Sequence, residues 1–232
     1  MRTAIVTGAT KGIGRAIVDA LTADGWRLGL IARNREDLIQ LVSETDCGHV
    51  AFVGSVTDSA FIDDAVNQMV AEFGHLDAMI ANAGVGTFAP IEQTSDAAFA
   101  EMMSTNVTGM FNCVRAAVRV MKPRGEGMIV PMLSIAAKQS FPMSSAYVAS
   151  KWAAYGMVQC VAKEVRKDGI RISSIFPGSV ATPFWDSMGG APWDTADMLQ
   201  ADDVALAVLQ AVNTPESCVI DELVLMPPKG IL

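Results

Sequence analysis

Short apolar runs and helix-like segments alternate along the chain, and this alternation restricts the fold more than any other feature of the sequence. Patterns typical of strands lie near residues 3–7, 27–32, 49–53, 77–81, 127–133, 171–176 and 222–226, with helical patterns between them. Strands separated by helices pair in parallel through right-handed crossovers. We therefore expect an α/β fold, with a doubly wound parallel sheet of about seven strands and helices on both faces.

The chain has 232 residues, of which 51% are hydrophobic, and it can bury one large core around such a sheet. We expect residues 1–232 to form a single domain. No apolar run approaches the roughly 18 residues of a membrane span, and we expect neither a membrane-spanning helix nor a secretory signal. The four cysteines lack C-x-x-C spacing, so we interpret Cys47, Cys113, Cys160 and Cys218 as reduced core thiols of a cytoplasmic protein.

The charge balance and the histidine content argue against several classes of function. A formal net charge of −8, from 17 basic and 25 acidic residues, opposes the phosphate-neutralising surface that nucleic-acid binding requires. His49 and His75 are the only histidines, and neither lies in a cluster of the metal-ligand type. We expect no nucleic-acid partner, no metal site and no Ser-His-Asp hydrolase.

A glycine turn follows the first strand pattern. Gly8, Gly12 and Gly14 have the spacing Gly-x-x-x-Gly-x-Gly, and an apolar-periodic helix continues from the turn. Glycines let the backbone turn tightly and approach a pyrophosphate, which then lies at the helix N-terminus. The spacing differs from the Gly-x-Gly-x-x-Gly dinucleotide motif, so a glycine-rich turn without function is the alternative for this segment taken alone.

Tyr147, Lys151 and Ser134 form a candidate proton-transfer group. Tyr147 and Lys151 are four residues apart and therefore share one face of a helix. The pKa of a free tyrosine is about 10, and a neighbouring ammonium lowers this pKa toward neutrality, where Tyr147 can act as a general acid. Ser134 ends a strand pattern and offers a hydroxyl to the same substrate oxygen. Taken alone, a Tyr-x-x-x-Lys pair is usually only a helix face.

Together these segments resemble the short-chain dehydrogenase/reductase family nearly from end to end. Further matching motifs are Asn82-Ala83-Gly84 after the fourth strand, Asn106 in Ser-Thr-Asn-Val-Thr-Gly, and residues 177–182 after the sixth strand. The resemblance implies a Rossmann-like fold and an enzyme that transfers hydride between a nicotinamide cofactor and a carbonyl or alcohol.

The resemblance also implies a role for each matching residue. Tyr147 would be the acid/base, Ser134 would orient the carbonyl, and Lys151 would bind the nicotinamide ribose and lower the pKa of Tyr147. Asn106 would anchor a water that links Lys151 to solvent; the alternative for Asn106 is a helix residue that faces solvent. Besides Tyr147 and Lys151, the expected cofactor-binding residues are Gly8, Thr10, Lys11, Gly12, Ile13, Gly14, Arg33, Ser55, Val56, Asn82, Ala83, Gly84, Pro177, Gly178, Val180 and Thr182.

The end of the second strand indicates which nicotinamide cofactor is bound. NAD enzymes usually place an acid about 20 residues beyond the glycine turn to hold the ribose hydroxyls. This chain has Ala32 and then Arg33 there, and it carries Lys11 inside the glycine turn. Two cations at the adenosine ribose suit a 2′-phosphate, so we expect NADP(H). The alternative is that Arg33 and Arg35 only solvate a loop.

Two residues depart from the family pattern. The third strand usually ends with an aspartate that touches adenine, whereas this chain has Ser55, which can make such a contact only through its hydroxyl. Pro131 lies inside a predicted central strand, where it cannot donate a ladder hydrogen bond, so we expect a bulge or a broken ladder there.

Residues 183–200 correspond to the substrate-covering segment of the family, with Gly189-Gly190 as the expected hinge. Phe184, Trp185 and Trp193 predict an apolar lid over an aromatic or aliphatic carbonyl, or an oligomer interface. Helical segments 106–120 and 147–165 carry apolar residues on more than one face, as in family members that pair these helices, so we expect a homodimer or homotetramer.

The sequence thus favours an NADPH-dependent reductase of a small-molecule ketone or aldehyde. Three alternatives stay open: an NAD-type alcohol dehydrogenase, a non-catalytic NADP(H)-binding protein, and a 3-oxoacyl thioester reductase. The last would use Lys122, Arg124, Arg166 and Lys167 to meet an acidic carrier protein.

Overall fold

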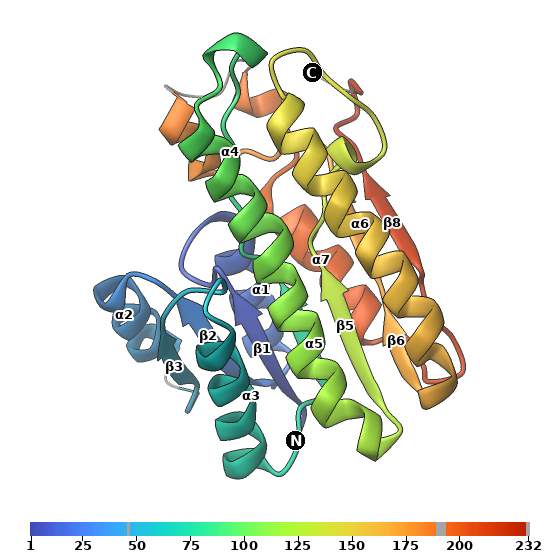
Figure 1. The fold of residues 1–232 in the computed structure, drawn as a ribbon. Coiled ribbons are helices and arrows are strands. Elements are labelled where there is room, and N and C mark those ends of the chain that lie inside the picture. The colour runs from blue at the N-terminus through green and yellow to red at the C-terminus, as the bar shows by residue number, and fades with distance from the viewer. Residues whose placement is uncertain (46, 189–193, 231–232) are drawn as a thin grey trace.

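The computed structural model describes residues 1–45, 47–188 and 194–230, and its centre is a six-stranded parallel sheet (Figure 1). The strand order is β3-β2-β1-β4-β5-β6, so the direction of winding reverses between β1 and β4. The six strands are β1 (Thr3–Thr7), β2 (Arg27–Ala32), β3 (Val50–Val53), β4 (Ala78–Ala81), β5 (Gly127–Pro131) and β6 (Ile170–Ile172).

Helices cover both faces of the sheet, as expected for a doubly wound fold. They are α1 (Gly12–Ala23), α2 (Arg35–Thr45), α3 (Ser59–Phe73), α4 (Asp96–Met103), α5 (Met110–Met121), α6 (Ser145–Val165) and α7 (Ala201–Val212). Side chains alternate along each strand. Ala4 and Val6 of β1 therefore pack in one core with α1, α2 and α7, while Ile5 packs in the other core with α3, α5 and α6. The α/β class predicted from the alternation is confirmed.

The expected seventh strand pairs differently from the prediction. The run 171–176 was expected to be one strand, but it divides at Ser173 into β6 and β7 (Ser174–Pro177). β7 pairs with β8 (Glu222–Leu225) in a separate two-stranded sheet. The Ser173 hydroxyl donates to the Ile220 carbonyl at 2.6 Å and the Ser174 amide donates to the Asp221 carbonyl at 2.9 Å, and these bonds turn the chain toward β8.

Pro131 explains where the strand divides. On the β4 side, pairing is continuous through Ala81↔Pro131 and the Met132 amide. On the β6 side, pairing stops at Ile129↔Ile172 and returns only at a single bridge, Met132↔Ile175. Proline has no N–H to donate to the neighbouring strand. The broken ladder expected at Pro131 is confirmed. It contains no bulge, because the pairs Ile129↔Ile172 and Met132↔Ile175 have the same register.

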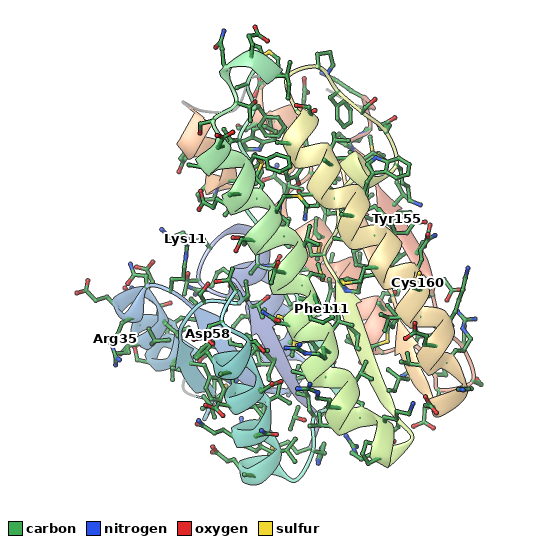
Figure 2. The ribbon with its side chains drawn as sticks, viewed as in Figure 1. Lys11, Arg35, Asp58, Phe111, Tyr155 and Cys160 are labelled. Atoms are coloured by element: carbon green, nitrogen blue, oxygen red, sulfur yellow. The ribbon has the colours of Figure 1, made fainter. Side chains whose placement is uncertain are left out.

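The exposed side chains that the structure describes include two cysteines and two aromatic residues; Phe111 and Cys160 are labelled in Figure 2. Cys113 is buried, and burial raises the pKa of its thiol to about 12. Cys160 and Cys218 are exposed, so the prediction that they are core thiols was wrong: Cys160 lies on the outward face of α6 and Cys218 in a loop. Phe111 on α5 and Trp152 on α6 are also exposed. Within the described ranges, no helix combines the length and apolarity needed to cross a membrane.

Candidate active site

The reversal of winding between β1 and β4 is built from reciprocal hydrogen bonds. The Thr7 hydroxyl accepts the amides of Asn82 and Ala83 at 3.0 and 2.9 Å. The Asn82 side-chain amide donates to the Thr7 and Gly8 carbonyls at 2.9 and 3.3 Å. Asn82, which the sequence predicted as a cofactor residue, therefore also shapes the glycine turn. Thr7 was missed, although a hydroxyl at the last position of an otherwise apolar strand was a usable signal.

The glycine turn has the geometry of an anion cradle. Gly8 has φ 65°, a left-handed conformation that favours glycine. A Cβ on Gly14 would overlap the Gly8 carbonyl oxygen, so the turn closes only with glycine there. Lys11, at the N-cap of α1, makes no side-chain capping bond, and the first turn contains no acid. The first amides of α1 are thus available to a pyrophosphate, and the residues present fit a dinucleotide.

The segment after β7 reaches the same turn. A Cβ on Gly12 would lie 3.1 Å from the Thr182 side chain, so Thr182 adjoins the cradle. The Val180 carbonyl accepts the Trp185 indole N–H at 2.9 Å and thereby anchors the segment that follows. Gly178 faces elsewhere: its amide donates to the Leu225 carbonyl at 2.8 Å, and it packs on Pro227. Pro177 ends β7 and pairs with Leu225.

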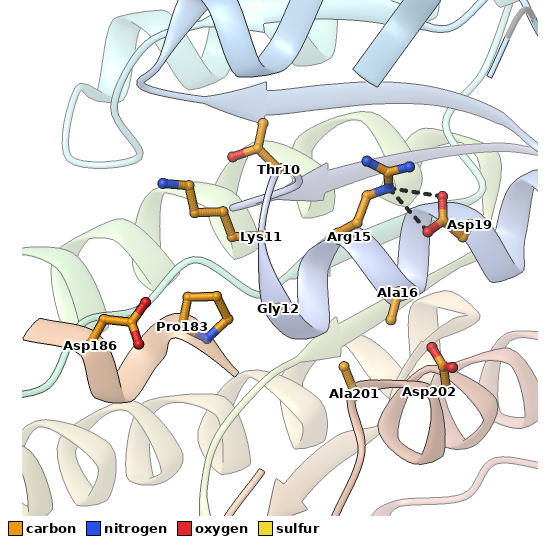
Figure 3. A pocket seen from close by; sticks show the side chains of 10 residues that line it. All are labelled: Thr10, Lys11, Gly12, Arg15, Ala16, Asp19, Pro183, Asp186, Ala201 and Asp202. Atoms are coloured by element: carbon orange, nitrogen blue, oxygen red, sulfur yellow. Dashed lines mark hydrogen bonds and ion pairs between the residues drawn. The ribbon is translucent and has the colours of Figure 1, made fainter. Parts of the chain in front are cut away.

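A polar hollow of about 560 Å³ adjoins the outer side of the glycine turn (Figure 3). Its lining residues come from the turn, α1, the 3₁₀ helix Pro183–Met188 and α7; they are Thr10, Lys11, Gly12, Arg15, Ala16, Asp19, Pro183, Asp186, Ala201 and Asp202. Arg15 is held by Asp19 at 3.0 Å, as Figure 3 shows. The lining carries the cations Lys11 and Arg15 beside the three acids Asp19, Asp186 and Asp202.

Of the residues expected at the adenosine end, Arg33 and Ser55 follow β2 and β3, and Lys11 lies in the glycine turn. Arg33 is exposed one residue beyond β2, and the Lys11 ammonium lies 3.7 Å from a carboxylate oxygen of Asp37. The Ser55 hydroxyl accepts the Thr57 amide at 3.2 Å, so it is engaged in a local turn. Val56 is buried and its carbonyl accepts the Asn112 side chain, which makes it a packing residue.

Three more cofactor candidates have identified positions. Ile13 is partly buried against the core shared by α1 and α7. Ala83 is partly buried against the opposite core. A Cβ on Gly84 would lie 3.3 Å from the Asn106 Oδ1 and 3.7 Å from the Lys151 Nζ. The chain segment after β4 therefore runs directly beside the proposed catalytic side chains.

Ser134, Tyr147 and Lys151 are brought together at the carboxyl end of the sheet. Ser134 follows β5 and its hydroxyl hydrogen-bonds the Tyr147 phenol. Tyr147 and Lys151 lie on one face of α6, with the Lys151 Nζ 5.7 Å from the centre of the Tyr147 ring. Lys151 is buried, and its ammonium donates to the Met132 carbonyl at 3.1 Å.

The pKa of Tyr147 differs from the prediction. A nearby ammonium was expected to lower it, but burial among apolar groups raises the Tyr147 pKa to about 12, against the opposing effect of the Ser134 hydrogen bond. Burial also lowers the pKa of Lys151 to about 8. The ammonium donates to a backbone carbonyl rather than to the phenol, so desolvation outweighs its field. Tyr147 is accordingly a protonated phenol at neutral pH, ready to donate.

Asn106 is buried, so the alternative that it faces solvent is wrong. It lies in a π-helical turn, Ser104–Gly109, and binds Val85 twice: its Oδ1 accepts the Val85 amide at 2.9 Å and its Nδ2 donates to the Val85 carbonyl at 2.8 Å. Its Nδ2 also donates to the Ser150 hydroxyl at 2.9 Å, which donates to the Tyr147 carbonyl at 2.7 Å.

Ser150 therefore connects Asn106 to the turn of helix that carries Tyr147 and Lys151. The sequence analysis missed this residue. A serine directly before the lysine, three residues after the tyrosine, was the available signal, because at this spacing a helical hydroxyl can bond a carbonyl of the preceding turn.

The covering segment reaches Tyr147 through its aromatic residues. Phe184 lies 6.0 Å from Tyr147, and Phe88, from the chain after β4, lies 5.4 Å from Tyr147, measured between ring centres. The expected hinge Gly189-Gly190 and Trp193 lie outside the described residues. In the described part of the chain, no group of three His, Cys, Asp or Glu residues is arranged to hold a metal ion.

Comparisons with known proteins agree with this geometry. Residues 2–191 match the protein family described as short chain dehydrogenase. A sepiapterin reductase from Chlorobaculum tepidum is 30% identical over 97% of this chain and 96% of its own length. An alcohol dehydrogenase from the archaeon Thermococcus sibiricus, complexed with 5-hydroxy-NADP, superposes with a TM-score of 0.87 and 29% identity, covering 98% of this chain and 97% of its own.

A metagenomic short-chain oxidoreductase in complex with NADP superposes with a TM-score of 0.83 and 28% identity, covering 97% of this chain and 96% of its own. The chain therefore belongs to the short-chain dehydrogenase/reductase family. It is an oxidoreductase that acts on alcohol or carbonyl groups with a nicotinamide cofactor.

The buried ammonium of Lys151 predicts a dependence of stability on pH. Its pKa falls from 10.5 to about 8 on folding, so between these values the unfolded chain binds more protons and stability rises with pH. Over that window we expect Lys151 to contribute an increase of about 3 kcal/mol in unfolding free energy, which Lys151→Met abolishes. Denaturant titrations from pH 7.5 to 10 measure it. The control Lys163→Met, at an exposed position of the same helix, should keep the increase; an unchanged slope in Lys151→Met would contradict the assignment.

Proposed function

We propose that this protein is an NADPH-dependent reductase of a ketone or aldehyde, reversible in principle toward the alcohol. The observation that carries the proposal is the convergence of a Ser134 hydroxyl, a protonated Tyr147 phenol and a buried Lys151 ammonium at the carboxyl end of the sheet, beside an uncapped helix N-terminus.

The side chains divide the chemistry among them. A reduced nicotinamide cofactor held at the glycine turn would supply the hydride that the carbonyl carbon accepts. Tyr147 transfers its phenolic proton to the carbonyl oxygen, and Ser134 donates a hydrogen bond to the same oxygen as negative charge develops. Lys151, with a pKa near 8, is charged at neutral pH and stabilises the phenolate that forms. Hydrogen bonds through Asn106 and Ser150 connect the π-helical turn to α6, and they keep Tyr147 and Lys151 at a fixed position relative to that turn.

The preference for NADP(H) rests on two cations at the adenosine end. Arg33 is exposed beside the end of β2, and Lys11 stands at the N-cap of α1. Arginine and lysine form charge-assisted hydrogen bonds with phosphate oxygens but gain little from a ribose hydroxyl. The two solved relatives described above carry NADP or a derivative of it, which supports the same preference.

The remaining alternatives have less support. Lys122, Arg124 and Arg166 pair with acids, Lys122 with Asp168 at 2.9 Å, and they precede β5 and β6. They therefore lie at the edge of the sheet opposite to Tyr147 and are paired within the chain, which weakens the case for a carrier protein docked on them. An NAD-type alcohol dehydrogenase usually carries an acid where this chain has Ala32 and Arg33. A non-catalytic binding protein would not need the Ser134–Tyr147 hydrogen bond.

The first test separates proton transfer from cofactor binding. Tyr147→Phe keeps the ring but removes the donated proton, so we expect turnover to fall by about 10²–10⁴-fold while NADPH affinity stays within about twofold. Lys151→Ala should weaken both. Turnover with a reduced carbonyl and NADPH binding by fluorescence are measured for both variants. Near-normal turnover in Tyr147→Phe would leave a cofactor-binding fold without the assigned acid.

The second test concerns the cofactor. We expect NADPH to bind about ten- to a hundredfold more tightly than NADH, the value of one charge-assisted hydrogen bond. Arg33→Ala should remove most of this difference, and Lys11→Ala less, because Asp37 already offsets Lys11. Arg35→Ala is the matched control and should change neither dissociation constant. Equal binding of both nucleotides to the unaltered protein would disprove the preference.

The third test concerns assembly. α5 and α6 pack on the same face of the sheet and expose Phe111 (42%) and Trp152 (48%), which we propose to be covered in a homodimer or homotetramer. Sedimentation at micromolar concentration should give a multiple of 24.6 kDa. The double variant Phe111→Ser, Trp152→Ser should shift the mass to one chain, whereas Ile39→Ser, exposed on α2, should not. A purely monomeric wild type would refute the assembly.

A further inference from the structure

Four aromatic side chains form a cluster at the Tyr147 phenol. They come from three separate segments: Phe88 from the chain after β4, Tyr147 from α6, and Phe184 and Trp185 from the 3₁₀ helix Pro183–Met188. The Phe88 ring lies 5.4 Å from Tyr147 and 5.8 Å from Trp185, and Phe184 lies 6.0 Å from Tyr147 and 5.5 Å from Trp185. All of these distances between ring centres are in the range of favourable aromatic pairs.

The orientations of the rings define a platform and a wall. Phe88 and Trp185 are stacked, with 18° between their planes, while Phe184 stands edge-on to both, at 78° to Phe88 and 90° to Trp185. The Trp185 indole N–H is bonded to the Val180 carbonyl at 2.9 Å, which fixes that ring. Phe88 and Trp185 therefore form a platform whose orientation is set by stacking and one hydrogen bond.

Phe184 is held close to the backbone at Gly86. A Cβ on Gly86 would overlap the Phe184 ring and lie 3.2 Å from the Tyr147 ring. The absence of a side chain at Gly86 thus lets Phe184 lie against the chain after β4. Phe88 and Phe184 both lie against the Tyr147 ring, so they are aromatic side chains that can flank a carbonyl bound at its phenol.

We propose that the aromatic cluster selects ketones and aldehydes whose carbonyl is attached to a planar aromatic ring, and that Phe88 is the residue that determines this specificity. The inference rests on the proposed reductase function and names its substrate class. The cluster offers ring faces and edges, which favour an aromatic substituent over a saturated one of the same size through the ring quadrupole. Phe88 contacts Tyr147, Phe184 and Trp185 together, so its ring orders the whole cluster.

The experiment compares acetophenone with cyclohexyl methyl ketone, which differ in the aromaticity of one six-membered ring. Steady-state kinetics with NADPH are measured for the wild type and for Phe88→Leu, which keeps an apolar side chain but removes the ring. Comparing the ratio of the two kcat/KM values between variants cancels the different intrinsic reactivities of the ketones. Phe184→Leu provides a second ring deletion in case Phe88→Leu does not fold.

The control is Phe73→Leu. Phe73 ends α3, at the edge of the sheet opposite to the active site, and packs against the core formed with α5 and α6. It tests the general effect of a Phe→Leu change on this protein. NADPH affinity is measured for every variant and should stay within about twofold of the wild-type value, because the clustered rings belong to the substrate side.

We expect Phe88→Leu to lower the kcat/KM for acetophenone relative to cyclohexyl methyl ketone by about two- to tenfold, mainly through KM, the range expected for one aromatic pair. Phe73→Leu should leave the ratio unchanged. A ratio unchanged in both Phe88→Leu and Phe184→Leu would overturn the specificity while leaving the reductase function standing. Absence of NADPH oxidation with both ketones and with simple aliphatic aldehydes, despite tight NADPH binding, would instead refute the proposed function.

Discussion

The reciprocal hydrogen bonds between Thr7 and Asn82 are the constraint on which the rest of the site depends. They join the ends of β1 and β4, where the winding reverses. By holding the Gly8 carbonyl, Asn82 sets the path of the glycine turn and the direction of α1. By fixing the chain after β4, Thr7 sets the position of Gly84, Val85 and Phe88, and so of everything that contacts them.

From this junction a second set of polar contacts reaches the catalytic helix. Asn106 binds both backbone groups of Val85, Ser150 bonds Asn106, and the same hydroxyl bonds the Tyr147 carbonyl. Buried polar groups are costly unless they are paired, so each member of this chain of contacts requires the next. The buried Lys151 ammonium has its own acceptor in the Met132 carbonyl, which β5 delivers just beyond Pro131. The glycine turn and the proton donor therefore keep their relative position through hydrogen bonds that the cofactor itself need not supply.

How much the sequence could predict is clear at individual residues. The bounds of β1 and β2 and the convergence of Ser134, Tyr147 and Lys151 followed from periodicity, from the placement of motifs after strands and from the family resemblance. The division of the strand at Ser173 could not be predicted from the sequence, because β7 pairs with β8, which lies some fifty residues further along the chain. Only the broken ladder at Pro131 was predictable locally, since proline has no N–H to donate. The exposure of Cys160 could not be predicted either, since composition does not say which face of a long helix meets solvent.

The sequence by itself determined the fold class, the family and the side chains that do the chemistry, because these depend on local patterns: strand and helix periods, glycines at fixed spacing and a tyrosine one helical turn from a lysine. Only the tertiary structure decided the electrostatic state of that pair. Spacing alone predicted a lowered Tyr147 pKa, whereas burial raises it to about 12 and lowers that of Lys151 to about 8. The physical reason is that desolvation depends on every group packed around a charge, including Phe88 and Phe184 from distant segments, and no local pattern records that environment.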